Sequence, residues 1–340
     1  MKIWEINDKF GIENLKLSDA EEPRPGPGQV KLRMLAASLN YRDLVIVQGE
    51  YGKVIKPPVI PVSDGVGEVV EVGEGVTKFK VGDRLCPIFF PDWIQGEASG
   101  DALRQDRALG ASRNGMLCEF AVVDEERAVL IPDYLSNIEA ATLPCAGVTA
   151  WNALMHGRPI MPKETVLIQG TGGVSIIALQ LAKAMGANAI VTSSSDEKLD
   201  RAKRLGADAT VNYRQYEDWH KEIVKICAGG VDRVIEVGGA ETLSKSLKAV
   251  RTGGTVSLVG ILSGGKAAIE LALVVMRYIR LDGITVGSRC DFECMLRTMN
   301  DVKLRPEVGL TVPFNEVPAA FEKVREGGTF GKICVSFDAM

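Results

Sequence analysis

Residues 165–186 read TVLIQGTGGVSIIALQLAKAMG, and this stretch decides the fold of a large part of the chain. It begins with a short apolar run, as in a buried strand, and after the glycines its apolar residues recur at helical spacing. Glycines let the backbone turn and come close to a ligand, and a helix N-terminus offers free N–H groups to a pyrophosphate. The stretch therefore predicts a strand, a loop and a helix that bind a dinucleotide, through Gly170, Thr171, Gly172, Gly173 and Val174.

The residues that follow continue this alternation of strands and helices. Strands are expected at 189–193, 208–213, 231–239, 255–265 and 283–288, with helices at 196–206 and 241–254 among the segments between them. Strands that alternate with helices form a parallel, doubly wound sheet. This context favours a dinucleotide site over the alternative, a glycine-rich turn that binds no ligand.

Residues 1–131 have a different pattern, with short strands, turns and few helices. Residues 28–38 alternate like a strand, and residues 65–85 read as a strand, a glycine turn and a second strand that ends in a Gly-Asp turn. Residues 306–340 hold a short helix, a glycine-rich turn and a closing strand, which we expect to return to the first domain. The predicted fold class is α/β: an antiparallel, barrel-like domain of 1–131 and 306–340, with a doubly wound domain of 132–305 inserted into it.

Composition excludes several function classes. The net charge of −4 favours neither a nucleic acid nor an anionic membrane as a partner. The apolar run 267–279 is interrupted by Glu270 and Arg277 and is shorter than the roughly 20 residues that cross a bilayer. The first ten residues lack the apolar core of a signal peptide. The 7 cysteines include no C-x-x-C pair and indicate reduced thiols, so we expect a cytoplasmic protein.

The end of the strand 189–193 bears on the choice of cofactor. NAD-binding units usually carry an acid there for the ribose hydroxyls, but this chain has Ser193, Ser194 and Ser195. Without an acid, a 2′-phosphate meets no repulsion, and serine hydroxyls with the nearby Lys198 can bind it. The sequence therefore favours NADP over NAD. Ser195 or Asp196 can also simply cap the next helix.

The chain resembles the medium-chain dehydrogenase/reductase superfamily over essentially its whole length. The similar segments include AASLNYRD (36–43), PVSDGVGEVVEVGEGVTKFKVGDRL (61–85), AATLPCAGVTAWNAL (140–154) and GKICV (331–335), in the family's order. Within the superfamily the chain is most similar to the zinc-less quinone oxidoreductase and enoyl reductase branch. The resemblance implies a GroES-like catalytic domain with an inserted Rossmann domain, and a homodimer formed through the strand expected at 283–288.

The resemblance also implies that the protein works without zinc. The positions of the three catalytic zinc ligands of zinc-dependent members fall on Asn40, Ser63 and Cys145, so a single good ligand is left. Asp64 matches an acid that usually lies behind the metal. Alcohol oxidation needs a metal to stabilise an alkoxide, whereas hydride addition to a conjugated carbonyl leaves an enolate that hydrogen bonds can support. We therefore expect NADPH-dependent reduction of quinones or α,β-unsaturated carbonyl compounds.

Three residues near the lost metal positions are the candidate catalytic groups. Tyr41 can donate a hydrogen bond or a proton to the substrate oxygen, or it can pack against the nicotinamide. Asn40 can orient the substrate oxygen or serve as a turn residue, and Asp64 can line the site or bond backbone amides. The resemblance implies further cofactor contacts at Thr149, Lys198 and Tyr213. Ligands of such sheets bind at the strand ends, so Gly238 and Gly260 at later strand ends are also candidates, as are Ser288 and Arg289 just after the last strand, and Lys332.

Two other readings remain open. One is a zinc-free alcohol dehydrogenase or carbonyl reductase, and the other is a non-catalytic NADPH-binding protein. The segment 89–109, which contains Trp93, is expected to shape substrate specificity.

Overall fold

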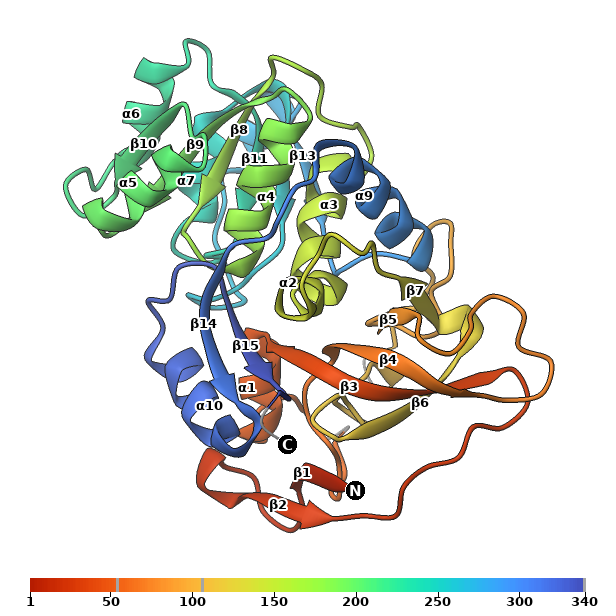
Figure 1. The fold of residues 1–340 in the computed structure, drawn as a ribbon. Helices are drawn as coiled ribbons and strands as arrows, with labels where there is room; N and C mark the ends of the chain where they lie inside the picture. The colour runs from red at the N-terminus through yellow and green to blue at the C-terminus, as the bar shows by residue number, and fades with distance from the viewer. Residues whose placement is uncertain (53–54, 105–106, 339–340) are drawn as a thin grey trace. The chain divides into compact units, whose positions relative to one another are not determined.

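The computed structural model describes residues 1–52, 55–104 and 107–338. The chain divides into two compact units (Figure 1). The first unit comprises Met1–Val148 and Val286–Met340, and the second unit is Thr149–Thr285.

The second unit is built on a six-stranded parallel sheet in the order β10-β9-β8-β11-β12-β13. Its strands are β8 (Thr165–Gln169), β9 (Asn188–Ser193), β10 (Ala209–Asn212), β11 (Val231–Glu236), β12 (Val250–Leu258) and β13 (Arg280–Gly283). Its helices are α3 (Val148–Met155), which begins in the first unit, α4 (Gly173–Ala184), α5 (Asp196–Arg204), α6 (Trp219–Ile226), α7 (Leu243–Ala249) and α8 (Leu271–Met276). The predicted doubly wound sheet is confirmed.

Two strands of this sheet differ from the sequence-based expectation. β12 begins at Val250, inside the range expected to be helical, because Val250 pairs with Val231 of β11. β13 ends at Gly283, whereas 283–288 was the expected strand. Arg280–Gly283 pairs with β12, and after Ile284 the chain turns at Val286, which has a φ of 54°. The start of β12 and the end of β13 are therefore set by pairing with the neighbouring strand rather than by the pattern of apolar residues.

The first unit holds a sheet in the order β14-β15-β3-β4-β5-β7, with β6 paired to β3, and a separate hairpin of β1 and β2. Its strands are β1 (Lys2–Ile6), β2 (Leu15–Asp19), β3 (Gln29–Leu39), β4 (Asp64–Val72), β5 (Arg84–Pro87), β6 (Phe120–Asp124), β7 (Ala128–Leu130), β14 (Val308–Pro313) and β15 (Lys332–Ser336). All pairs are antiparallel except β14 with β15. Because β15 pairs with β3, the expected return of the tail to this domain is confirmed.

The helical elements of the first unit are α1 (Tyr41–Val47), α2 (Asn137–Ala141), α9 (Arg289–Val302) and α10 (Val317–Glu326), with short turns η1 (Ile12–Asn14), η3 (Glu125–Arg127), η4 (Leu143–Gly147) and η5 (Phe314–Glu316). The second strand expected within 65–85 is shorter and later, as β5. The backbone N–H groups of Thr77 and Lys78 donate instead to the carboxylate of Glu125, which replaces a strand ladder there.

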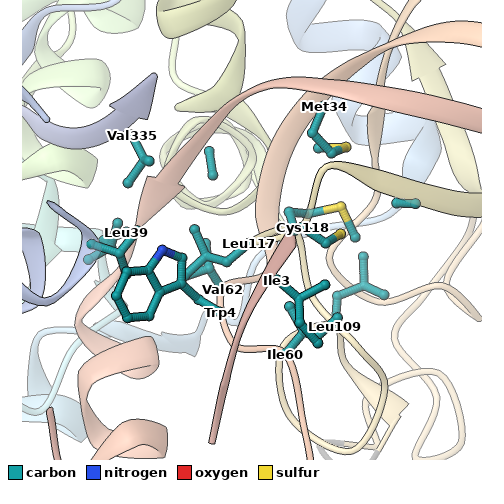
Figure 2. Close-up of a cluster of buried hydrophobic side chains, with 14 of the residues drawn as sticks. Ile3, Trp4, Met34, Leu39, Ile60, Val62, Leu109, Leu117, Cys118 and Val335 are labelled. Atoms are coloured by element: carbon teal, nitrogen blue, oxygen red, sulfur yellow. The ribbon is translucent and has the colours of Figure 1, made fainter. Parts of the chain in front are cut away.

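The core of the first unit joins segments that are far apart in the chain. Figure 2 shows Trp4 of β1 together with Leu117, with Leu39 of β3 and with Val335 of β15. The Trp4 indole N–H donates to the carbonyl of Phe314 at 2.7 Å. The N-terminal and C-terminal segments are therefore packed into one core, which supports the loop from β3 into α1.

The compact units differ in their bounds from the expected domains of 1–131 with 306–340 and 132–305. The units divide the chain after Val148 and again before Val286. The reason is packing: α2 lies against β3 and β4, and α9 lies against β7 and η4, so both helices join the first unit.

Within the described residues, no helix has both the length and the apolar character needed to cross a membrane.

Candidate active site

The glycine-rich loop of the second unit connects β8 to α4. Gly170 has a φ of 73°, which favours glycine, and Gly172 is the residue before the first turn of α4. A Cβ atom added at Gly172 would meet no atom within 4 Å, so the space above the loop is open. Ser175 stands where the usual motif has its third glycine. Its hydroxyl donates to the carbonyl of Gln169 at 2.7 Å, so the close approach of helix and strand is kept.

The N-terminus of α4 is available to an anion. The N–H groups of Gly173 and Val174 lie in the first turn of α4, where they have no partner within the helix, and no side chain caps the helix. Free N–H groups at the positive end of a helix dipole are the standard partner of a dinucleotide pyrophosphate. These residues fit the cofactor that the fold implies.

The residues expected to bind a 2′-phosphate come together at the carboxyl ends of β9 and β10. The N–H of Tyr213 donates to the carbonyl of Ser193, so the two strand ends are adjacent. Lys198 lies in the first turn of α5, and Ser194 lies between this turn and β9. Within the described part of the chain, the Lys198 ammonium forms no ion pair, so its charge is available to a ligand.

Asp196 follows Ser195 at the start of α5 and is hydrogen-bonded to two side-chain amides. Asp196 accepts hydrogen bonds from Asn212 at 2.8 Å and from Gln215 at 3.0 Å, and both of its carboxylate oxygens are used. Ser195 caps α5, since its hydroxyl accepts from the N–H of Lys198 at 3.4 Å. The helix-cap role considered for this segment thus falls on Ser195.

A buried polar network at the ends of β8 and β11 was missed at the level of sequence. Glu236 is 0% exposed and accepts hydrogen bonds from Gln169 and Ser246, and from the N–H groups of Gly238 and Gly239. The available signal was a polar residue that ends each of two apolar runs, VLIQ and VIE. Gly260 lies beside it, and its N–H donates to the carbonyl of Glu236 at 3.1 Å.

In the first unit, Asn40 is the residue that begins α1. Its N–H donates to the carboxylate of Asp43 at 2.8 Å, which fixes the turn from β3 into the helix. The ammonium of Lys332 donates to the Asn40 side-chain oxygen at 2.5 Å and to the carbonyl of Leu39 at 2.6 Å. This orients the amide, and the Asn40 side chain also lies against the Asp64 carboxylate, where it favours the charged form and so lowers the Asp64 pKa. An oriented amide at this position is suited to a substrate oxygen.

Asp64 lies at the start of β4 and is 0% exposed. One of its oxygens accepts from the Ser63 hydroxyl at 2.7 Å, and the other accepts from the N–H of Cys145 at 3.0 Å. Burial raises the pKa of Asp64, and the charge of Lys332 opposes this rise. The alternative role considered for Asp64, bonding a backbone amide in a buried turn, is therefore present.

Two neighbours of Asp64 have perturbed pKa values. Burial raises the pKa of Asp43 to about 6, with Arg42 opposing and Asp64 reinforcing the rise. Burial and the charge of Asp64 raise the pKa of the Cys145 thiol, which makes it a poor thiolate nucleophile.

Other predicted residues lie in different settings. Tyr41 is the first residue of α1 and is 55% exposed, so its phenol is accessible. Thr149 is buried in α3. Ser288 caps α9 through Asp291, and Arg289 pairs with Glu126 and Glu293. These two side chains belong to the first unit and have protein partners there, as Lys332 does.

The donors at the expected metal positions do not fit catalytic zinc. An amide at Asn40, a hydroxyl at Ser63 and a thiol with a raised pKa at Cys145 replace the usual ligands, and both oxygens of Asp64 are already used. The Lys332 ammonium brings a positive charge to Asn40. Across residues 1–52, 55–104 and 107–338, no group of three or more His, Cys, Asp and Glu side chains is arranged to hold a metal ion.

Comparisons with known proteins agree with this architecture. Residues 26–133 match the family model of the alcohol dehydrogenase GroES-like domain, and residues 173–301 match that of the zinc-binding dehydrogenases. A zinc-type alcohol dehydrogenase-like protein of Schizosaccharomyces pombe is 39% identical, with 98% of each chain covered. An acryloyl-coenzyme A reductase of Metallosphaera sedula is 31% identical over 95% of this chain and 97% of its own.

Among solved structures, a putative alcohol dehydrogenase from Sinorhizobium meliloti 1021 matches with a TM-score of 0.93 and 37% identity, covering 99% of this chain and 98% of its own. An alcohol dehydrogenase-like protein, a putative alcohol dehydrogenase and an acryloyl-coenzyme A reductase are thus similar to this chain over nearly its whole length. The chain is an NAD(P)-dependent oxidoreductase and belongs to the medium-chain dehydrogenase/reductase superfamily.

Proposed function

We propose that the protein is an NADPH-dependent reductase of α,β-unsaturated carbonyl compounds or quinones that transfers hydride without zinc. The observation that carries the proposal is the Asn40 amide at the position of a lost metal ligand. Lys332 donates to its oxygen, and the side chain lies against the buried Asp64 carboxylate, so the amide is held in place. Its NH₂ group would bind the substrate oxygen and stabilise the enolate that forms there, which a metal would otherwise do.

The second unit would hold the cofactor. The N–H groups at the start of α4 would bind the pyrophosphate, and Lys198, Ser193 and Ser194 would bind the 2′-phosphate. When bound, the reduced nicotinamide supplies the hydride. β9 itself ends in a serine rather than the acid usual in NAD-binding units, and Asp196 in the next helix is held by Asn212 and Gln215.

The first unit would supply the groups that act on the substrate. Asn40 would orient the carbonyl oxygen, and the exposed phenol of Tyr41 would deliver the proton that completes the reduction. Asp64 would act indirectly, since its oxygens hold Ser63 and the backbone of Cys145 in position. The similarity to an acryloyl-coenzyme A reductase supports a conjugated carbonyl as the substrate class.

A spectrophotometric panel tests the proposal. We expect NADPH oxidation with quinones or enones and none with simple ketones or aldehydes, in protein dialysed against a chelator. Turnover of simple alcohols or aldehydes alone would indicate a zinc-free alcohol dehydrogenase, and tight NADPH binding without turnover would indicate a non-catalytic binding protein. Loss of activity on chelation, restored by Zn²⁺, would overturn the zinc-free mechanism. An unchanged kcat in Tyr41→Phe would remove the phenol from the mechanism.

The choice of cofactor has its own test. Lys198→Ala removes a charge that would pair with the 2′-phosphate, so we expect the Kd of NADPH to rise about tenfold or more. The Kd of NADH should stay within about twofold, because NADH carries no 2′-phosphate. Lys203→Ala is the matched control, since Lys203 lies on the same helix and pairs with Asp200. Equal losses for NADPH and NADH would contradict the assignment.

A homodimer is proposed as well. β13 has a single hydrogen-bonded neighbour, β12, so its outer edge is free within the described chain. Large apolar side chains next to it are exposed, including Met276 at 81% and Tyr278 at 83%. A second copy of this chain would cover the strand edge and these side chains together.

A further inference from the structure

Glu236 is a buried carboxylate that the proposed reaction does not use. It is the last residue of β11 and is 0% exposed. It forms no ion pair with any of the described residues, so hydrogen bonds alone compensate its burial. Burying a carboxylate destabilises the folded state unless both of its oxygens accept hydrogen bonds. The donors to each oxygen therefore show which segments Glu236 holds in position.

One oxygen of Glu236 organises the loop that follows β11. This oxygen accepts from the N–H groups of Gly238 at 2.8 Å and Gly239 at 3.0 Å, and from the Thr242 hydroxyl at 2.5 Å. The loop is tightly packed, since a Cβ atom added at Gly238 would lie 2.3 Å from that hydroxyl. The carboxylate therefore fixes the backbone of residues 237–242.

The other oxygen of Glu236 is directed at β8. It accepts from the Gln169 amide nitrogen at 2.8 Å and from the hydroxyl of Ser246, and this amide nitrogen also donates to Ser246 at 2.7 Å. The Gln169 amide oxygen accepts from the N–H groups of Val237 at 3.2 Å and Gly238 at 3.4 Å. Every polar atom of the two side chains thus has a partner.

Gln169 and Glu236 lie at the ends of neighbouring strands, each next to a loop. Gln169 ends β8 and directly precedes Gly170, the first residue of the glycine-rich loop, while Glu236 ends β11, the neighbouring strand. The pair therefore ties the loop 170–173 to the loop 237–242 across the carboxyl edge of the sheet. Ligands of open α/β sheets bind at this edge.

We propose that Gln169 and Glu236 are positioning residues that hold the loops 170–173 and 237–242 in one fixed arrangement for the dinucleotide. The proposal rests on the cofactor site described under the proposed function. Loops held before the ligand arrives need no ordering when it binds, so the pair increases cofactor affinity without touching the reacting atoms.

The isosteric variant Glu236→Gln tests the proposal. Its new NH₂ group must face either the N–H groups of Gly238 and Gly239 or the NH₂ group of Gln169, so two donors oppose each other in either orientation. We expect the Kd of NADPH, measured by fluorescence titration without substrate, to rise tenfold or more. Glu241→Gln is the matched control, because Glu241 is an exposed acid in the same loop.

An exchange variant supplies the rescue. In Gln169→Glu with Glu236→Gln, the amide and the carboxylate trade places, and the amide nitrogen again donates to a carboxylate oxygen. The backbone N–H groups keep acceptors, and the Ser246 hydroxyl can turn to suit the new pair. We expect this variant to bind NADPH within about threefold of the wild type. No rescue by the exchange would contradict a role for the pairing itself.

Stability measurements separate positioning from simple structural support. A variant that melts earlier but binds NADPH with wild-type affinity when folded would overturn the inference. If Glu236→Gln does not fold, Ser246→Ala removes one hydroxyl of the network, and an unchanged Kd in that variant has the same consequence. Wild-type protein that binds neither NADPH nor NADH would overturn the proposed function as well, whereas wild-type binding with unaffected variants overturns this inference alone.

Discussion

Asn40 carries the greatest weight among single residues. Its side-chain oxygen and nitrogen have different tasks, because Lys332 donates to the oxygen and the nitrogen is the donor of the amide. Asn40→Asp keeps an acceptor for Lys332 and removes the donor, so we expect kcat for an enone to fall by about 10²–10³-fold, the usual effect of losing one such donor. The Kd of NADPH should not change, since Asn40 lies in the first unit.

The control for this change is Asn14→Asp, because Asn14 lies in the first unit but in the short turn η1. Stopped-flow measurement of a single turnover would separate the hydride step from product release. A kcat within threefold of the wild type for Asn40→Asp would remove the proposed donor.

Asp43 makes the stability of the first unit depend on pH. Burial raises its pKa from 3.8 to about 6, with Arg42 opposing the rise, Asp64 adding to it and Lys332 opposing it. Because the folded pKa is the higher one, its favourable contribution is complete below pH 4 and is lost as the pH rises through 6. A shift of this size corresponds to about 3 kcal/mol at about 1.4 kcal/mol per unit.

Asp43→Asn stays neutral over this range and keeps an oxygen acceptor for the Asn40 N–H. We expect the free energy of unfolding of the variant, relative to wild type, to increase by up to about 3 kcal/mol between pH 4 and pH 7. Urea unfolding at a series of pH values measures it. A constant difference between the two proteins would show that Asp43 does not titrate in this window.

At the scale of elements, Ser288 caps helix α9, although its position in the chain also made it a candidate cofactor contact. The Ser288 hydroxyl accepts from the N–H of Asp291 at 3.1 Å and donates to its carboxylate at 2.6 Å. Ser288→Ala should therefore lower the free energy of unfolding by about 1 kcal/mol and leave the Kd of NADPH unchanged. Ser194→Ala provides the comparison at the cofactor cluster. A weaker Kd in Ser288→Ala would restore Ser288 to the cofactor contacts.

Sequence patterns predicted the elements well where local and tertiary preferences agree. The segment around Gly170 became β8, a loop and α4 because apolar periodicity and glycine position point to the same structure. The sequence pattern does not predict a strand at residues 280–283, because charged residues interrupt the apolar alternation there. This segment is a strand because it pairs with β12.

The candidate site was predictable to a similar extent. The glycines and the serines after β9 follow from their positions in the chain, but the partners of Lys332 and Glu236 do not. Those partners lie up to 293 positions away, and only the fold brings them together.

At the scale of the whole molecule, the free edge of β13 makes association testable. Leu281 of β13 is 39% exposed, and Leu281→Lys adds a charge to that edge. We expect the wild type to elute as a dimer in size-exclusion chromatography with light scattering, and the variant as a monomer. Leu17→Lys is the control, because Leu17 is 45% exposed on β2 of the first unit. A wild type that is monomeric at micromolar concentration would rule out the dimer.

The pairing of β15 with β3 has a consequence for synthesis on the ribosome. The second unit is continuous in sequence, so it can fold as soon as it emerges. The sheet that carries Asn40 must wait for Lys332, which is translated 293 codons after Leu39. A nonsense mutation ahead of the codon for Lys332 would therefore leave the edge of β3 and the side-chain oxygen of Asn40 without these partners, while the whole second unit would still be translated.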